Sequence, residues 1–255
     1  MRRLLGLQAS VRRIYAYTAY IHDRLAKGFA AASVVVSLAH SMAVVTGLPS
    51  FATDPSSALL PLLMMTSLIY YISIVYIAYS MAQELGEGPA ALYLSHPLGR
   101  VEYLLSWFAA GLLTTSILYL ASIVAPVLVM DPALVSSVDM AVLATLVFEG
   151  LVTGAFVFLV ALLTRRRGAT FFAGLVYILV VPLALSIVAA IVAAAVPRQT
   201  LVETLVKTVF MLLYPCKYYA IERPTNAMAT SMPSALLSLV LLGSCLVYAK
   251  RKLEV

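Results

Sequence analysis

Long runs of apolar residues with almost no charge dominate this sequence. A helix needs about 20 apolar residues to cross a hydrocarbon core, and only helices and closed barrels satisfy every backbone hydrogen-bonding group there. The runs lack the strict polar–apolar alternation of a membrane barrel. They cover residues 28–47, 58–82, 104–130, 140–163, 169–196 and 234–249. We therefore predict an all-α integral membrane protein with six transmembrane helices in a single domain, 1–255.

The composition fits a chain that presents much of its surface to lipid. Of 255 residues, 63% are hydrophobic and only 11% are charged, whereas soluble domains carry about 25% charged residues. These values exclude a disordered chain, a disulfide scaffold and a free nucleic-acid binder. We expect membrane lipid as a partner and no nucleic acid.

The positions of Lys and Arg indicate the orientation of the helices. With the N-terminus inside, the outer segments hold only a few of the 17 basic residues, namely Arg198, Lys207, Lys217 and Arg223. The others fall in inner segments, which fits the positive-inside rule. We expect a multi-pass plasma-membrane protein with both termini in the cytoplasm. Attraction to anionic lipid is a secondary role for these charges, at about 1 kcal/mol per basic residue.

An amphipathic pattern precedes the first apolar run. One helical face carries Val11, Ile14, Thr18, Ile21 and Leu25. The apolar stretch that follows Arg3 is too short for a signal peptide. Two interpretations remain open for residues 1–27: an interfacial helix along the inner membrane face, and a cytoplasmic extension of the first membrane helix.

The sequence lacks the motifs of a nucleotide or metal site. It contains no G-x-x-x-x-G-K-[ST], no G-x-G-x-x-G and no H-E-x-x-H. The histidines are too scattered for a metal cluster, and Cys216 and Cys245 do not form a C-x-x-C pair. We expect no catalytic residue, cofactor or metal in this chain.

The segment between the second and third runs, 83–103, combines turn signals with an apolar patch. A helix can start at Pro89, after Gly88, because a proline at the first helical position loses no hydrogen bond. Pro97 ends this helix. Its apolar surface consists of Leu92, Leu94 and Leu98. A helix this short cannot bury that surface alone, so we expect it to dock onto a partner.

This segment resembles the coupling region of type-2 ATP-binding-cassette (ABC) transporter permeases, the exporter-like transmembrane subunit family. The match comprises an acidic residue, a glycine, part of a leucine run and a closing Ser-x-Pro-[aliphatic]-[small]-Arg signature: Glu84, Gly88, Leu92, Leu94, Ser95, Pro97, Leu98, Gly99 and Arg100. Pro89 stands where the family usually has threonine, and Tyr93 interrupts the leucine run. The arrangement of an N-terminal helix, six spans and a longer outer segment is also similar.

The resemblance implies a permease that pairs with a second copy or a related permease and with separate ABC ATPase subunits, which bind ATP and Mg²⁺. It implies that the short inner helix transmits closure of the ATPase to the membrane helices. The coupling residues would be Glu84, Gly88, Leu92, Ser95, Pro97 and Arg100. The structural alternative is a solvated turn in which Arg100 only sets the topology. The competing class is a non-transport membrane protein, either an intramembrane enzyme or an assembly subunit.

Two ionisable residues lie inside predicted membrane helices at similar depth. They are His40 in the first run and Glu149 in the fourth. A carboxylate at that depth costs about 2.5–3.5 kcal/mol, so Glu149 should face protein or be protonated. Either the two form a proton-linked or substrate-contacting pair, or Glu149 makes a packing hydrogen bond to Thr145, Thr153 or a tyrosine.

Three further patterns lie in the second half of the chain. Apolar residues repeat at helical spacing over 201–213 and stop at Tyr214-Pro215, which predicts an outer amphipathic or re-entrant helix before the last span. A loop anchored by tyrosines at the interface is the alternative. Pro182 predicts a kink in the fifth helix. Gly150 and Gly154 permit close helix packing, within one subunit or between two.

Overall fold

A computed structural model provides the structure of the chain. It describes residues 8–22, 31, 34–35, 38, 55–88, 99–130, 140–195, 201–222 and 227–252. Nearly all of these residues are helical, and none of them lies in a strand. Most of the predicted first span, together with His40 and the segment 89–98, lies outside the described residues.

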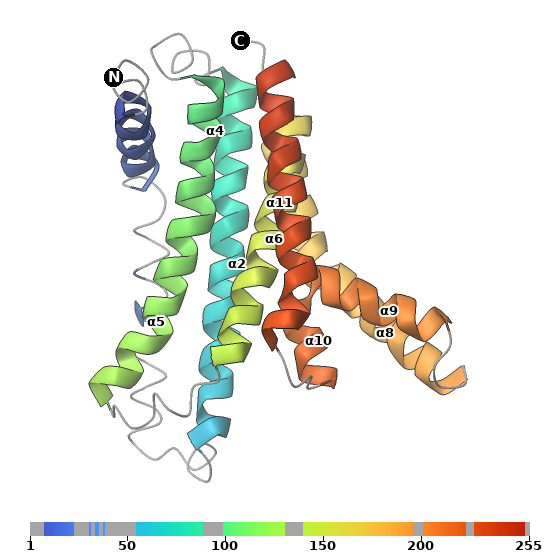
Figure 1. The fold of residues 1–255 in the computed structure, drawn as a ribbon. Helices are drawn as coiled ribbons and strands as arrows, with labels where there is room; N and C mark the ends of the chain where they lie inside the picture. Colours follow the sequence, from blue (N-terminus) through green and yellow to red (C-terminus); the bar gives the residue numbers. More distant parts are fainter. Residues whose placement is uncertain are drawn as a thin grey trace.

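The helices form an elongated bundle with one lateral arm (Figure 1). Their bounds are α2 Pro55–Glu87, α4 Arg100–Phe108, η1 Ala109–Thr114, α5 Thr115–Met130, α6 Met140–Thr164, α7 Arg167–Leu175, η3 Val176–Val180, α8 Val181–Ala195, α9 Leu201–Leu213, α10 Pro215–Glu222 and α11 Ala227–Lys252. The backbone stays helical through the π-helical turns η1 and η3. The segments α4, η1 and α5 therefore form one continuous rod, as do α7, η3 and α8.

Some of these helices are long and apolar enough to cross a membrane. Within the described ranges there are 4 such stretches: Arg100–Val124, Val142–Thr164, Arg167–Val192 and Ser231–Lys252. They indicate an integral membrane protein, so the predicted all-α membrane fold is confirmed at this level. The α7–α8 rod is the least buried of them, and it leaves Leu183, Ile187 and Ile191 exposed.

Helix α6 lies at the centre of the bundle. It contacts α2, α7, α10 and α11, and Figure 1 shows α2, α4, α6 and α11 running together along the long axis. The largest fully buried side chains include Trp107, Tyr103, Phe158 and Ile77. The core therefore lies where α2, α4 and α6 meet.

Two helices extend past the apolar runs that predicted them. Helix α2 continues to Glu87 through polar residues, and the Gln83 Nε2 donates to Glu87 at 2.9 Å one turn away. Gly88, with φ +92°, ends this helix in the left-handed conformation that glycine adopts easily. Helix α11 begins at Ala227 and includes Pro233. Hydropathy locates only the apolar part of a helix. Polar residues at its ends can continue the same backbone hydrogen-bonding pattern, so the helix is longer than its apolar run.

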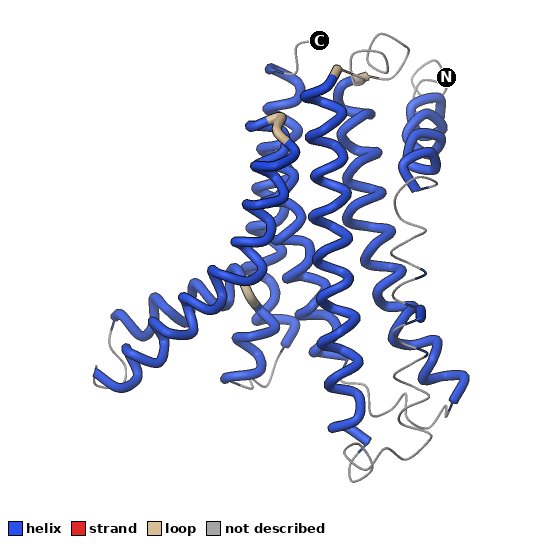
Figure 2. The backbone as a smooth tube through the Cα atoms, turned by 180° about the vertical axis from the view of Figure 1, so that it is seen from behind, coloured by secondary structure: helices blue, strands red, loops and turns tan. Residues whose placement is uncertain are grey.

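The backbone is irregular just before Pro182. The π-helical turn η3 directly precedes the first turn of α8, which contains this proline. A proline has no N–H and crowds the carbonyl four residues earlier, so a wider turn accommodates it. Figures 1 and 2 show α8 leaving the bundle at an angle, with α9 beside it.

The Gly150 and Gly154 pair packs within this chain. A Cβ atom at Gly150 would clash with Tyr70, and one at Gly154 would clash with Leu112. The Tyr70 hydroxyl is hydrogen-bonded to the Ser116 hydroxyl at 2.7 Å, which restricts the ring. The glycines thus let α6 approach α2 and η1 closely.

We expect Gly150→Ala to lower the thermal stability of the purified protein, because overpacking a core costs about 1–3 kcal/mol. The control is Gly243→Ala, where a Cβ would meet nothing within 4 Å. It should unfold at the wild-type temperature or slightly above, since alanine favours helix. Scanning fluorimetry in detergent measures both variants. Equal melting temperatures would show that Tyr70 moves freely.

Candidate functional site

The N-terminal helix, residues 8–22, runs alongside α4 and η1 in the same direction. Its contacts recur at a constant separation of 92 residues: Ser10 Oγ to the Glu102 carboxylate, Ser106 Oγ to the Ile14 carbonyl (3.3 Å) and His22 Nε2 with Thr114 Oγ1 (2.8 Å). This constant offset requires two parallel neighbouring helices. The helix therefore follows the axis of α4 and does not cross the end of the bundle (Figures 1 and 2).

The docked face of the N-terminal helix differs from the predicted apolar face. Ile21 is buried, as expected for that face, but Val11 is 58% exposed, and Tyr17, which is not on the predicted face, is buried. Arg13, which the pattern puts elsewhere on the wheel, lies on the docked face and binds Glu102. The interface is therefore partly ionic.

Glu102 joins the N-terminal helix to the first turn of α4. Its carboxylate accepts hydrogen bonds from Arg13 Nε at 3.0 Å and Arg13 Nη2 at 2.6 Å, and from the Ser10 hydroxyl. It also accepts the Gly99 backbone N–H at 3.0 Å, which caps α4. A two-pronged Arg–carboxylate contact fixes orientation as well as distance. The same contact raises the pKa of Arg13.

Glu84 makes a second connection to the N-terminal helix from the end of α2. Its Oε2 accepts hydrogen bonds from the Tyr17 hydroxyl at 2.8 Å and the Tyr103 hydroxyl at 3.2 Å. The two tyrosine rings also pack together, with centroids 5.6 Å apart. Glu84 and Glu102 therefore hold the N-terminal helix at the two points where the chain enters and leaves the segment 89–98.

The predicted coupling residues divide between described and undescribed parts of the chain. Glu84 is partly buried against α4, Gly88 ends α2, and Arg100 is exposed at the start of α4. Leu92, Ser95 and Pro97 lie outside the described residues. The predictions did not include Glu102 and Arg13 in this site, because no local motif links residues so distant in sequence.

Two arginines tie the turn between α6 and α7 to the same end of the bundle. Arg167 pairs with Glu87 at 3.3 Å, and Arg165 Nη2 donates to the Lys252 carbonyl at 3.1 Å. The second contact satisfies a carbonyl at the C-terminal end of α11. This end of the bundle thus joins α2, the α6–α7 turn and α11.

A second polar contact lies inside the bundle at Glu149. This residue is 5% exposed, and its carboxylate accepts the Cys216 backbone N–H at 3.2 Å. Cys216 follows Pro215 in the first turn of α10, where backbone N–H groups have no partner within the helix. The Thr153 hydroxyl donates to the backbone carbonyl of Glu149 and not to its carboxylate. Glu149 therefore caps α10, a role that depth alone did not predict.

Two tyrosines and a serine donate hydrogen bonds to backbone carbonyls where α9 meets η3 and α11. The Tyr177 hydroxyl donates to the Leu213 carbonyl at 3.3 Å, and the Tyr214 hydroxyl donates to the Tyr177 carbonyl at 2.6 Å. Ser234 donates to the Met211 carbonyl at 2.6 Å. The end of α9 is thus attached to η3 and α11. We call this set of contacts, with Glu149 and Cys216, the elbow.

The structure at the elbow confirms the helix predicted over 201–213 and excludes its alternative, a loop anchored by tyrosines. The predicted helix over 201–213 coincides with α9 and stops at Tyr214, as expected. The anchored-loop alternative is wrong, because Tyr214 is 2% exposed and packs with Phe210 against Val152 of α6. Helix α10 was not predicted, although a proline at the first helical position was a usable signal.

We expect Glu149→Leu to loosen the elbow, because a buried N–H without a partner costs about 1–3 kcal/mol. In a Cys245→Ala background, maleimide should then label Cys216 about fivefold faster or more. Glu149→Gln keeps an acceptor oxygen and should label at the wild-type rate. Identical rates in all three proteins would show that the Glu149 contact does not restrain α10.

Reversing the charge of either partner in the Arg13–Glu102 pair should release the N-terminal helix, since like charges replace a hydrogen-bonded ion pair. Hydrogen exchange of residues 8–22 should accelerate in Arg13→Glu and in Glu102→Arg, and the double variant should recover part of the protection. Arg12→Glu is the control, because Arg12 is exposed. Protection unchanged in both single variants would contradict this attachment.

Within the described residues, no group of three His, Cys, Asp or Glu side chains could hold a metal ion. No protein-family model matches the sequence, and the search of curated proteins found no similar chain. The features that bear on function are therefore the sequence motif, the attachment of the N-terminal helix and the elbow.

Proposed function

We propose that this chain is the transmembrane permease subunit of an ABC exporter. In this proposal six helices cross the plasma membrane, both termini are cytoplasmic, and α2 and the first run supply the two spans beyond the four apolar helices described above. The motif over 84–100 and the lack of a phosphate-binding loop in the sequence support a subunit driven by a separate ATPase.

The observation that carries this proposal is the double attachment of the N-terminal helix. Glu84 and Glu102 bind Tyr17 and Arg13 on either side of the segment 89–98. A segment that transmits closure of an ATPase must be joined stiffly to the membrane helices it moves. Here both flanking helices, α2 and α4, are fixed to one common element. Gly88, Leu92, Ser95, Pro97 and Arg100 would then contact the ATPase.

Helices α9 and α10 suit the role of an outer closure. They lie toward the end of the bundle opposite the one where α2 ends and α4 begins (Figure 1), and they join the bundle at the elbow. Broken helices within a membrane protein are tolerated where side chains satisfy the freed backbone groups. We propose that Glu149 positions this re-entrant pair and that alternating access displaces it. His40 stays a candidate partner of the same pathway.

A second permease, identical or related, completes the transporter in this proposal. The weakly buried α7–α8 rod offers apolar surface for such a neighbour or for lipid. ATP and Mg²⁺ bind the ATPase subunits, and the substrate is unidentified. The competing function, an intramembrane enzyme or an assembly subunit, requires no ATPase, so association with one separates the two classes.

We expect the tagged full-length chain, purified from its native membrane after mild cross-linking, to retain an ABC ATPase identifiable by mass spectrometry. Leu92→Asp should reduce the retained ATPase at least tenfold, because it places a charge in an apolar contact. The matched control is Leu205→Asp in α9, which should retain the ATPase. Absence of any ATPase from the wild-type protein would overturn the proposed function. Equal retention by Leu92→Asp would overturn only the coupling role of the segment.

A further inference from the structure

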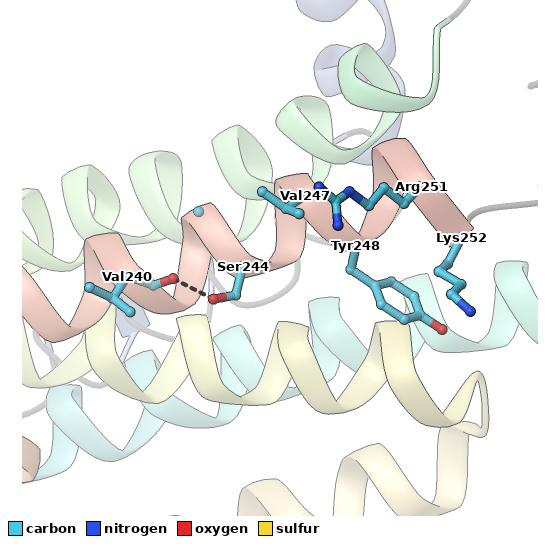
Figure 3. Close-up of a pocket in the computed structure, with 7 residues that line it drawn as sticks. Val240, Ser244, Val247, Tyr248, Arg251 and Lys252 are labelled. Carbon is cyan, nitrogen blue, oxygen red and sulfur yellow. Dashed lines mark hydrogen bonds between the residues drawn. The ribbon is translucent and has the colours of Figure 1, made fainter.

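One face of α11 forms a shallow groove on the surface of the bundle. Its volume is about 560 Å³, and its lining recurs at helical spacing (Figure 3): Val240, Gly243, Ser244, Val247, Tyr248, Arg251 and Lys252. None of these residues belongs to the N-terminal attachment or to the elbow. The groove is therefore separate from the site proposed for coupling.

The first part of the groove offers mostly apolar surface. Val240 and Val247 are 65% and 53% exposed, and Gly243 leaves open space where a side chain would otherwise stand. The Ser244 hydroxyl donates to the Val240 carbonyl at 2.8 Å, so its one proton is already used (Figure 3). This part of the groove therefore suits a hydrocarbon chain.

The other end of the groove is basic. Arg251 and Lys252 are exposed, and within the described ranges neither forms an ion pair with a carboxylate. Figure 3 shows the Arg251 side chain folded back beside Val247, with Lys252 at the same end of the groove. Arg165, bonded to the Lys252 carbonyl, adds a third positive charge nearby.

We propose that this groove binds an anionic phospholipid, with an acyl chain along Val240 to Val247 and the phosphate at Arg251 and Lys252. The dimensions agree: from Val240 to Arg251 the helix rises about 16 Å, close to the roughly 15 Å of one hydrocarbon leaflet. The basic pair then stands at headgroup depth. Clusters of basic residues at this depth attract anionic lipid at about 1 kcal/mol per residue.

The charge pattern also argues against a second copy of the chain as the occupant. In a membrane dimer related by a twofold axis along the membrane normal, the same ends of the two helices face each other. Arg251 and Lys252 would then meet their own counterparts with no carboxylate between them. The lipid proposal does not depend on the transport function, because it concerns a different surface.

Native mass spectrometry of the detergent-purified full-length protein tests the site. The probes are phosphatidylglycerol and phosphatidylcholine with identical acyl chains, offered at equal concentrations. We expect wild-type protein to retain phosphatidylglycerol preferentially, and Arg251→Gln/Lys252→Gln to lower that preference by about fivefold or more. Arg166→Gln/Lys250→Gln removes the same charge from exposed positions that do not line the groove, and it should keep the preference. Equal loss in both double variants would overturn the groove in favour of diffuse charge.

A second variant tests the acyl part of the groove. Gly243→Leu fills the groove without a clash, because nothing lies within 4 Å of its Cβ position. It should lower phosphatidylglycerol retention at least threefold, whereas Gly168→Leu, equally open, should not. Soluble glycerophosphoglycerol that displaced the lipid at equimolar concentration would overturn the proposal, since the acyl chain would then contribute nothing. Efficient disulfide cross-linking of Val247→Cys between copies would overturn it in favour of a dimer.

Discussion

Every backbone N–H and C=O group inside a hydrocarbon layer needs a hydrogen-bond partner within the protein. An unbroken helix supplies these partners itself, but α9 and α10 meet at a break within the bundle. At this break the Glu149 carboxylate accepts a hydrogen bond from the Cys216 N–H of α10, and Tyr177 and Ser234 donate hydrogen bonds to carbonyls of α9. The packing of α9 and α10 onto α6 and α11 depends on these contacts, because a bare helix end could not be buried there.

Carboxylates perform the other structural task at the opposite end of the bundle. Glu84 and Glu102 attach the N-terminal helix to α2 and α4 through Tyr17 and Arg13. These contacts are more exposed to water than the elbow, so they fix orientation more than they contribute free energy. The difference fits two roles: a stiff interior contact that holds a break in place, and a peripheral contact that keeps three helices aligned.

Periodicity and hydropathy predicted the helical class, the position of α9 and its end at Tyr214, because each depends on neighbouring residues. They did not predict the ends of α2 and α11, because polar residues extend both helices beyond the apolar runs. They also missed the docking of Arg13 on Glu102, since an ion pair 89 residues apart has no periodic signature. The position of Glu149 within a predicted membrane helix correctly indicated that its carboxylate needs a partner in the protein. That position did not identify a backbone N–H as the partner.

The π-helical turn η3 couples the two helices of the lateral arm, α8 and α9. The Tyr177 carbonyl in this turn accepts the Tyr214 hydroxyl, while the Tyr177 hydroxyl holds the last residue of α9. One tyrosine thus serves both helices of the arm at the point where the arm meets the bundle. Because Tyr177 is hydrogen-bonded both to Tyr214 and to the end of α9, a displacement of α8 at this turn should displace α9 as well. The two helices of the arm should therefore move together about Tyr177.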